Sequence, residues 1–215
     1  MKKLKLSQAE IDKLVVVERR VVKATVEGVG LLDVDFVTRI SGARVWQLVL
    51  WRGMLKRCFS KDAYIKNPTY ADVTVCDEWL SFANFIEWCN KEVGYKGKPV
   101  GLELDKDILA IGNKVYSKDT CCFVPHQINM LFCTAGAKRG EHPIGVIEVK
   151  GRFVARLKMY GRKVNVGSYD TPERAFQAYK IAKEAHVKVV ADRYKEVLKP
   201  DVYAALMSWE ADIFS

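Results

Sequence analysis

The stretch PIGVIEVKGRFVARLKMYGRKVNVGSYDTPERAFQAYKIAKEAH, residues 143–186, decides the fold of the second half of this chain. Apolar and charged residues alternate on either side of Gly151, which predicts two strands of a half-buried sheet. The Tyr160-Gly161 turn leads into a third segment of the same character, RKVNVGSYD. The segment that follows has helical spacing. We therefore predict a three-stranded antiparallel sheet backed by one helix.

Alternation assigns the predicted strands an apolar face and a polar face. The apolar face is expected to hold Ile147, Val149, Phe153, Ala155 and Leu157. The polar face is expected to hold Glu148, Lys150, Arg152, Arg156, Lys158, Lys163 and Asn165. A sheet of this size can enter the major groove of DNA, where Arg and Lys pair with guanine edges and phosphates and Asn pairs with adenine.

The helix is expected to begin at DTPE, with Asp170 or Thr171 as its N-cap and Pro172 in its first turn. Its predicted apolar stripe consists of Ala175, Phe176, Tyr179, Ile181 and Ala182. This stripe is wide enough to cover the apolar face of the sheet. The cationic face would then remain exposed.

The segment GVIEVKGRFVARLKMYGRKVNVGSYDTPERAFQAYKIA resembles the plant ethylene-response-factor type of DNA-binding domain. Glycines, aromatic residues and the spacing from TPE to AY agree together over about fifty residues. The resemblance implies DNA contacts at Glu148, Lys150, Arg152, Arg156, Lys158, Lys163 and Asn165. Lys150 and Asn165 stand where such domains place tryptophans, so the plant target sequence does not carry over.

The first half of the chain contains a second motif, LELDKDILAIGNKVYSKDTCCFVPHQIN, residues 102–129. Its part from Leu104 to Pro125, together with the stretches from Trp51 to Cys58 and from Val75 to Trp88, resembles bacteriophage HNH homing endonucleases. In such proteins a DNA-binding domain of the type above can follow the nuclease. The resemblance implies a ββα-metal module that cleaves phosphodiesters with Mg²⁺ or Mn²⁺.

Carried over by position, Asp105 becomes the metal-binding acid, Asn129 the metal ligand on the helix, and Asn113 the asparagine that orients the loop. Lys106 stands in place of the histidine base. An ordinary lysine is protonated at neutral pH and cannot accept a proton from water. Two replacements for the base remain open.

Asp107 shares a strand face with Asp105 by period two and could serve as base or as a second ligand. His126, on the predicted helix, could approach from the other side. The simpler alternative is a solvated acidic turn, with Asn113 in a left-handed conformation and His126 on the surface.

Composition agrees with a nucleic-acid partner. The chain has 215 residues, a formal charge of +9 and a pI of about 9.2. The six cysteines lack CxxC spacing, which argues against zinc ribbons and favours buried, reduced thiols. The lysine-rich start lacks a long apolar run, so we expect neither a signal peptide nor a membrane span. We expect the protein in the cytoplasm of a bacterial host.

The remaining patterns describe helices. A capping box at Ser7 predicts an opening helix over 7–20, followed by short strands over 20–45. The stretch 44–59 is predicted as a helix with Trp46, Leu50, Met54 and Leu55 on its apolar face. The aromatic residues Trp79, Phe82, Phe85 and Trp88 are expected to pack against it.

The prediction is an α+β protein of two domains, 1–136 HNH-like and 137–215 of the ethylene-response-factor type. A final helix with Tyr203, Leu206 and Trp209 packs on the body or on a second copy, which would make a homodimer. The leading function is binding of double-stranded DNA, with metal-dependent nicking or cleavage. The alternatives are a DNA-binding regulator or counter-defence factor without catalysis, and an inhibitor that binds a host protein through the aromatic-rich first domain.

Overall fold

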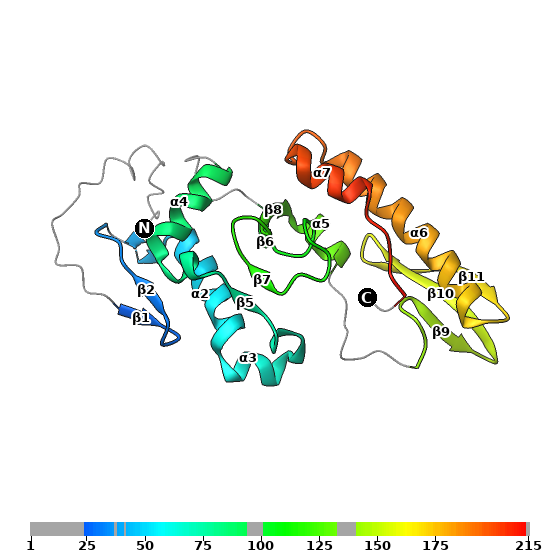
Figure 1. The fold of residues 1–215 in the computed structure, drawn as a ribbon. Helices are drawn as coiled ribbons and strands as arrows, with labels where there is room; N and C mark the ends of the chain where they lie inside the picture. Colours follow the sequence, from blue (N-terminus) through cyan, green and yellow to red (C-terminus); the bar gives the residue numbers. More distant parts are fainter. Residues whose placement is uncertain (1–23, 37, 41, 94–100, 133–140, 214–215) are drawn as a thin grey trace, which may run out of the picture. The chain divides into compact units, whose positions relative to one another are not determined.

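The fold is that of a computed structural model, which describes residues 24–36, 38–40, 42–93, 101–132 and 141–213. It mixes helices and strands in separate segments and is an α+β protein, as predicted (Figure 1). The chain forms two compact units. The first contains residues up to Asp107 together with Asn113–Phe123, and the second contains Ile108–Gly112 together with residues from Val124 onward. The predicted helix over 7–20 lies outside the described residues.

The first unit combines short strands with helices. Its strands are β1 (Ala24–Val26), β2 (Gly30–Leu32), β3 (Arg39–Ile40), β4 (Ala43–Arg44), β5 (Thr74–Val75), β6 (Leu102–Asp105) and β7 (Val115–Tyr116). Its helices are α2 (Trp46–Phe59), α3 (Lys61–Lys66) and α4 (Phe82–Val93), with the 3-10 turns η1 (Pro68–Tyr70) and η2 (Asp77–Leu80). β1 pairs with β2, β3 with β4, and β5 with β7.

An aromatic core between α2 and α4 holds the first unit together. Trp51, Trp79, Phe82 and Phe85 are almost fully buried, and the Trp51 Nε1 group donates a hydrogen bond to the Trp79 carbonyl at 2.6 Å. Each such ring contributes about 2 to 3 kcal/mol by leaving water. The predicted packing of the second aromatic group against the first helix is therefore confirmed.

The apolar face predicted for α2 was only half right. Met54 and Leu55 are buried, but the other buried positions of the helix are Leu48, Trp51 and Cys58. Trp46 and Leu50 are only partly buried. A helix packed on two sides buries a broader stripe than the single face inferred from sequence. β2 makes this close packing possible through Gly30, where a Cβ atom would collide with Leu55 and Trp51.

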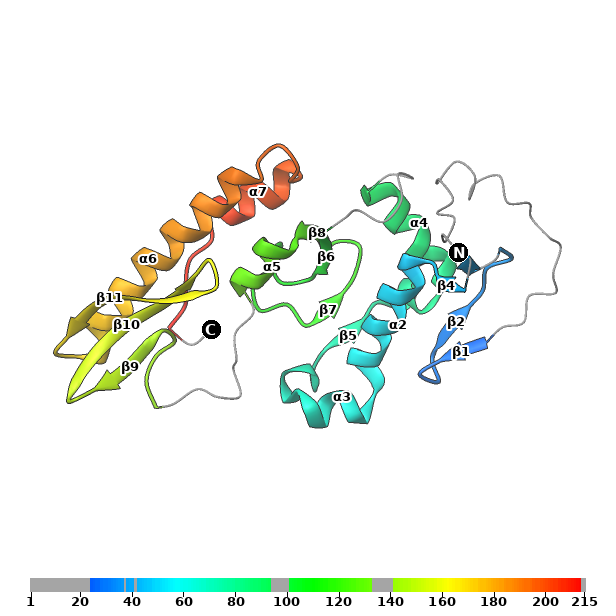
Figure 2. The same ribbon diagram turned by 180° about the vertical axis from the view of Figure 1, so that it is seen from behind.

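The second unit contains the predicted sheet and helix (Figure 2). Its elements are α5 (His126–Phe132), β9 (Val146–Val149), β10 (Arg152–Met159), β11 (Arg162–Tyr169), α6 (Pro172–Arg193) and α7 (Pro200–Met207). β8 (Cys122–Pro125) pairs with β6 and runs directly into α5. The sheet order is β11-β10-β9 and both pairings are antiparallel, so this part of the prediction is confirmed.

The turn between β9 and β10 corrects the predicted faces of β9. Lys150 and Gly151 both have positive φ and form a two-residue turn that pairs Val149 with Arg152. Residues paired across antiparallel strands share a face. Ile147 and Val149 therefore share the face of Arg152, and Glu148 shares the face of Phe153. The predicted faces of β9 were wrong, because they assumed that the alternation of β10 continues unchanged through the turn. Val146 is buried, whereas Val149 is 41% exposed.

Helix α6 covers one face of the sheet, the face that carries Ala155 and Leu157, as the ribbons in Figures 1 and 2 show. Thr171 is its N-cap and accepts a hydrogen bond from the Arg174 backbone, as the DTPE pattern predicted. The core beneath α6 consists of Val146, Ala155, Leu157, Ala175, Phe176 and Tyr179. Ile181 is 69% exposed, so its predicted place in the apolar stripe was wrong. At about 100° per residue, Ile181 lies on a different side of α6 from Phe176 and Tyr179, which face the sheet.

The C-terminal helix α7 packs against α6, and Val202 and Leu206 are buried. The predicted helix extended to residue 214, but α7 ends at Met207, and Trp209 packs edge-on against Phe132 of α5. Four of the five described cysteines are buried and all five are free thiols, as expected; Cys133 lies outside the described residues. No helix among the described residues could span a bilayer.

Candidate functional site

The loop that follows β6 contains the predicted acidic motif and is organised by hydrogen bonds. Lys106 Nζ lies 2.5 Å from Asp107 Oδ1 and 2.8 Å from the Asn113 carbonyl oxygen. The Asp107 backbone N–H donates to Asp105 Oδ1 at 2.8 Å. The three consecutive charged residues and Asn113 are thus brought together within one loop.

Asn113 fixes both ends of this loop through its side chain. Its Nδ2 group donates to the Lys106 carbonyl at 2.8 Å and to the Val115 carbonyl at 2.7 Å. Its Oδ1 atom accepts from the Val115 N–H at 3.0 Å. An asparagine side chain carries two donors and an acceptor, so it can replace the backbone pairs that an irregular loop lacks. The side chain therefore sets the position of Lys106.

Two charged residues of the loop, Asp105 and Lys106, are buried, so their charges depend on partners within the protein. Asp105 is 6% exposed and Lys106 is 9% exposed. The Lys106 ammonium lies 5.9 Å from the centre of the Tyr116 ring, and Tyr116 accepts a hydrogen bond from Arg57 through its hydroxyl. Burial raises the pKa of the neighbouring Cys121 thiol to about 12, so this cysteine is a protonated, inert packing residue.

The predicted metal site gains no support from the first unit. Asp107 is paired with the Lys106 ammonium, and Asp105 Oδ1 accepts the Asp107 backbone N–H. Among the described residues, no three His, Cys, Asp or Glu side chains are grouped to hold a metal ion. Asn129 and His126 lie on α5 in the second unit.

The exposed face of the β9–β11 sheet carries the predicted cationic residues. Register pairs Arg156 with Asn165 and Lys158 with Lys163, and Arg152 lies on the same side of β10 as Arg156 and Lys158. A bulge at the Ala155/Arg156 step shifts the register of β11. The side chains of β10 still alternate between the two faces, and Ala155 and Leu157 pack against α6. Arg152, Arg156 and Lys158 therefore lie on the face that points away from α6.

Two arginines on this face are held by neighbours on β11. Arg156 Nε donates to Asn165 Oδ1 at 2.9 Å. Arg152 donates from Nη2 to the Ser168 carbonyl at 3.1 Å, with Ser168 Oγ 3.4 Å from its Nε. A guanidinium oriented through Nε can still use its outer N–H groups for a planar acceptor pair.

Two residues expected on the cationic face lie elsewhere. Glu148 is paired with Phe153 across the strands, which places it on the opposite side from Arg152, and its carboxylate lies 3.4 Å from His142 Nε2. Lys150 occupies the exposed turn with a φ of 52°. The two-residue turn causes both differences.

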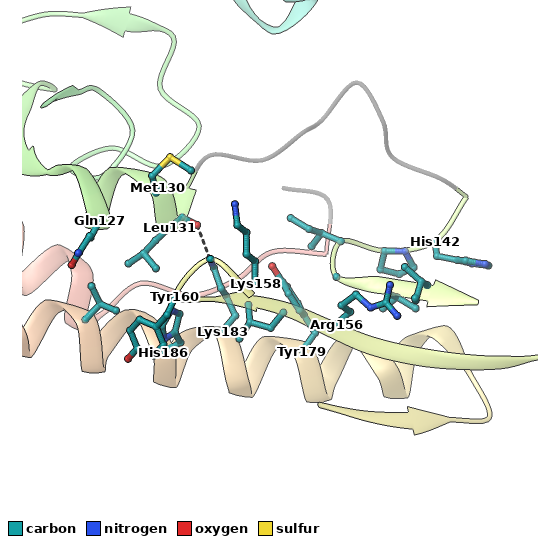
Figure 3. A pocket seen from close by; sticks show the side chains of 18 of the residues that line it. Gln127, Met130, Leu131, His142, Arg156, Lys158, Tyr160, Tyr179, Lys183 and His186 are labelled. Atoms are coloured by element: carbon teal, nitrogen blue, oxygen red, sulfur yellow. Dashed lines mark hydrogen bonds between the residues drawn. The ribbon is translucent and has the colours of Figure 1, made fainter. Parts of the chain in front are cut away.

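Sequence reasoning missed two buried polar residues on α6, Lys183 and His186 (Figure 3). They follow Phe176 and Tyr179 at the same helical spacing and precede Val187 and Val190, so they occupy positions that the stripe reserves for apolar residues. A lysine and a histidine at core positions of an amphipathic helix were the signal that could have found them.

Comparison with family models, with curated proteins and with solved structures found no match to this chain.

Proposed function

We propose that this protein binds double-stranded DNA through the face of the β9–β11 sheet that points away from α6. The observation that carries the proposal is the register, which places Arg152, Arg156, Lys158 and Lys163 on one face with Asn165. Arg and Lys bind phosphates and guanine edges, and Asn binds adenine. The overall charge of +9 would favour association with a polyanion.

The pairing of Lys158 with Lys163 supports this proposal. Like charges placed directly opposite each other on two strands destabilise a sheet. A phosphate between the two ammonium groups would relieve their repulsion. The cluster thus costs stability in the free protein and would gain it on binding.

The test compares two double variants of the full chain by fluorescence anisotropy with labelled duplex DNA. Arg156→Ala with Lys158→Ala removes two cations from the sheet face. Arg174→Ala with Lys188→Ala removes two exposed cations from α6 and serves as the charge-matched control. We expect the first to bind at least about tenfold more weakly, with a salt slope lower by about 2. Equal weakening in both variants would place the DNA surface elsewhere.

Phosphodiester cleavage at the loop over 105–113 is the second candidate. The observation that favours it is the Asn113 side chain, which holds the Lys106 carbonyl as the asparagine of an HNH loop would hold its base. Against it, Lys106 is engaged by Asp107 and Asn113 and stands where a base is required. The test incubates the protein with supercoiled plasmid and Mg²⁺, Mn²⁺ or a chelator, and measures nicking of the plasmid. Metal-dependent nicking that Asp105→Asn abolishes would establish cleavage, whereas intact plasmid would restrict the function to binding.

A further inference from the structure

The second unit contains a cavity of about 730 Å³ beside the sheet, lined by α5, the segment over 142–147, β10 with the turn that follows it, and α6 (Figure 3). Its size lies within the range of small-molecule sites. The chain has three histidines, and all three line this cavity: His126, His142 and His186. The three imidazoles supply the cavity with hydrogen-bond donors and acceptors.

The charged residues of the lining have one sign. Arg156, Lys158, Lys183 and Arg193 all border the cavity, and no aspartate or glutamate is among its described lining residues. Glu148 is not part of the lining, but its carboxylate lies 3.4 Å from Nε2 of His142, which is. Low-dielectric walls of one sign concentrate counter-ions, so this cavity attracts anions.

Lys183 is the most deeply placed of these cations, at 9% exposed. Its Nζ donates to the Leu131 carbonyl at 2.5 Å, near the C-terminus of α5. Burial lowers the pKa of this ammonium to about 8. A buried ammonium normally has a carboxylate partner, and the contact recorded for Lys183 is to a neutral carbonyl. The site thus has room for a negative charge that no described lining residue supplies.

His186 adds a hydrogen-bonding atom without a partner. It is 4% exposed, and within the described residues its buried Nδ1 finds no hydrogen-bond partner. The His186 ring lies edge-on to the Tyr160 ring, with 5.0 Å between the ring centres. The Arg193 guanidinium lies 4.8 Å from the centre of the Tyr160 ring. Buried polar atoms in folded proteins are nearly always satisfied, so an unpaired one calls for an explanation. A ligand atom would satisfy it.

The rest of the lining is apolar. Met130, Ile144, Val146, Leu157 and Val190 contribute hydrocarbon walls to the same cavity. Such walls favour a ligand with an apolar or aromatic body over a bare inorganic ion. The cavity therefore combines a polar, cationic end with a surface for hydrocarbon.

We propose that this cavity binds a small organic phosphate, with its phosphate beside Lys183 and His186 and its apolar or aromatic body against Leu157 and Val190. Four cationic residues suit a dianionic group better than a single carboxylate. Arg156 and Lys158 also belong to the face proposed for DNA, but Lys183 and His186, which would hold the phosphate, lie on α6. The two proposals can therefore fail separately.

The test uses the histidines as reporters, because the chain has no others outside the cavity. The full protein, without DNA, is titrated with phenyl phosphate, adenosine monophosphate, inorganic phosphate and benzoate while the imidazole NMR signals are followed. We expect the two organic phosphates to shift the His186 signal and to bind at least about tenfold more tightly than inorganic phosphate or benzoate. Phosphates that associate only with the outer face of the sheet would leave His186 unchanged.

Two variants locate the site. Lys183→Met keeps the approximate length of the side chain without its charge, and His186→Phe keeps an aromatic ring without its nitrogens. Each should weaken binding of the tighter organic phosphate at least about tenfold. Lys180→Met, on the same helix but outside the cavity lining, is the matched control and should bind as the wild type does. The proposal is overturned if neither organic phosphate shifts His186 at about 10 mM, which would fill even a millimolar site. It is also overturned if inorganic phosphate or benzoate binds equally well, or if both cavity variants bind normally.

Discussion

Two lysines in this protein are equally buried but differ in what surrounds them. Lys106, in the loop after β6, and Lys183, on α6, are each 9% exposed. Lys106 donates to the Asp107 carboxylate and to the Asn113 carbonyl. Lys183, within the part of the chain that the structure describes, donates to the neutral Leu131 carbonyl. The first charge is neutralised inside its own loop, whereas the second has no carboxylate among the described residues that line its cavity.

This difference separates a structural group from a candidate binding group. A buried ion pair that is complete does not need a ligand, and removing one partner harms the fold. A buried cation without a carboxylate lowers stability until an anion arrives. Residue type and burial are the same in both cases, so only the partners distinguish them. The comparison predicts stability effects of opposite sign.

The largest effect is expected for Lys183→Met in the second unit. Burial lowers the pKa of Lys183 from an ordinary value of 10.5 to about 8, which corresponds to about 3 kcal/mol against the charged form. Below pH 8 both folded and unfolded chains carry the proton, so this cost is present in full. Allowing about 1 kcal/mol for the lost bond to Leu131, the variant should be about 2 kcal/mol more stable at pH 7.

The same shift fixes the pH dependence of this gain. Between pH 8 and pH 10.5 the unfolded wild-type chain holds more protons at this site than the folded chain, so wild-type stability rises with pH. The advantage of Lys183→Met should therefore be constant below pH 8 and disappear by about pH 10. Urea unfolding followed by the histidine NMR signals measures it, because all three histidines lie in the second unit. A difference that does not change with pH would mean that Lys183 is already neutralised.

The sequence anticipated the second unit better than the first because its signals are local. Two glycine-containing turns and the DTPE cap each determine structure over a few residues, and they correctly placed β9, β10, β11 and the start of α6. Face assignment failed where it depended on the turn. Alternation within a strand is reliable, but a two-residue turn pairs an odd position with an even one.

The candidate sites were harder to predict because they depend on contacts between distant residues. The proximity of Asp105, Lys106, Asp107 and Asn113 could be inferred, since they belong to one loop. The pairing of Lys106 with Asp107 could not, because a lysine beside two aspartates can also extend into water. The cavity of the second unit joins α5 to α6 across about fifty residues of sequence. Lys183 and His186 had a local signal, but its meaning required the tertiary structure.

A smaller effect of opposite sign is expected for Lys106→Met in the first unit. The substitution keeps the length of the side chain and removes its ammonium, so the bonds to Asp107 and to the Asn113 carbonyl are lost. The Asp107 side chain is 47% exposed and can be rehydrated, which limits the cost of leaving it unpaired. We expect a loss of about 1 kcal/mol at neutral pH, measured by urea unfolding with tryptophan fluorescence. Four of the five tryptophans lie in the first unit, so this signal reports mainly on it.

Lys114→Met is the matched control for Lys106→Met, because Lys114 is an exposed lysine that follows Asn113 in the chain. Its loss should change the unfolding free energy little, since an exposed charge remains hydrated in both states. If Lys106→Met were instead neutral or stabilising, its ammonium would be as poorly compensated as that of Lys183. The loop would then be a second place where a buried cation awaits an anion, and a DNA phosphate at Lys106 would become the better explanation of why a lysine stands there.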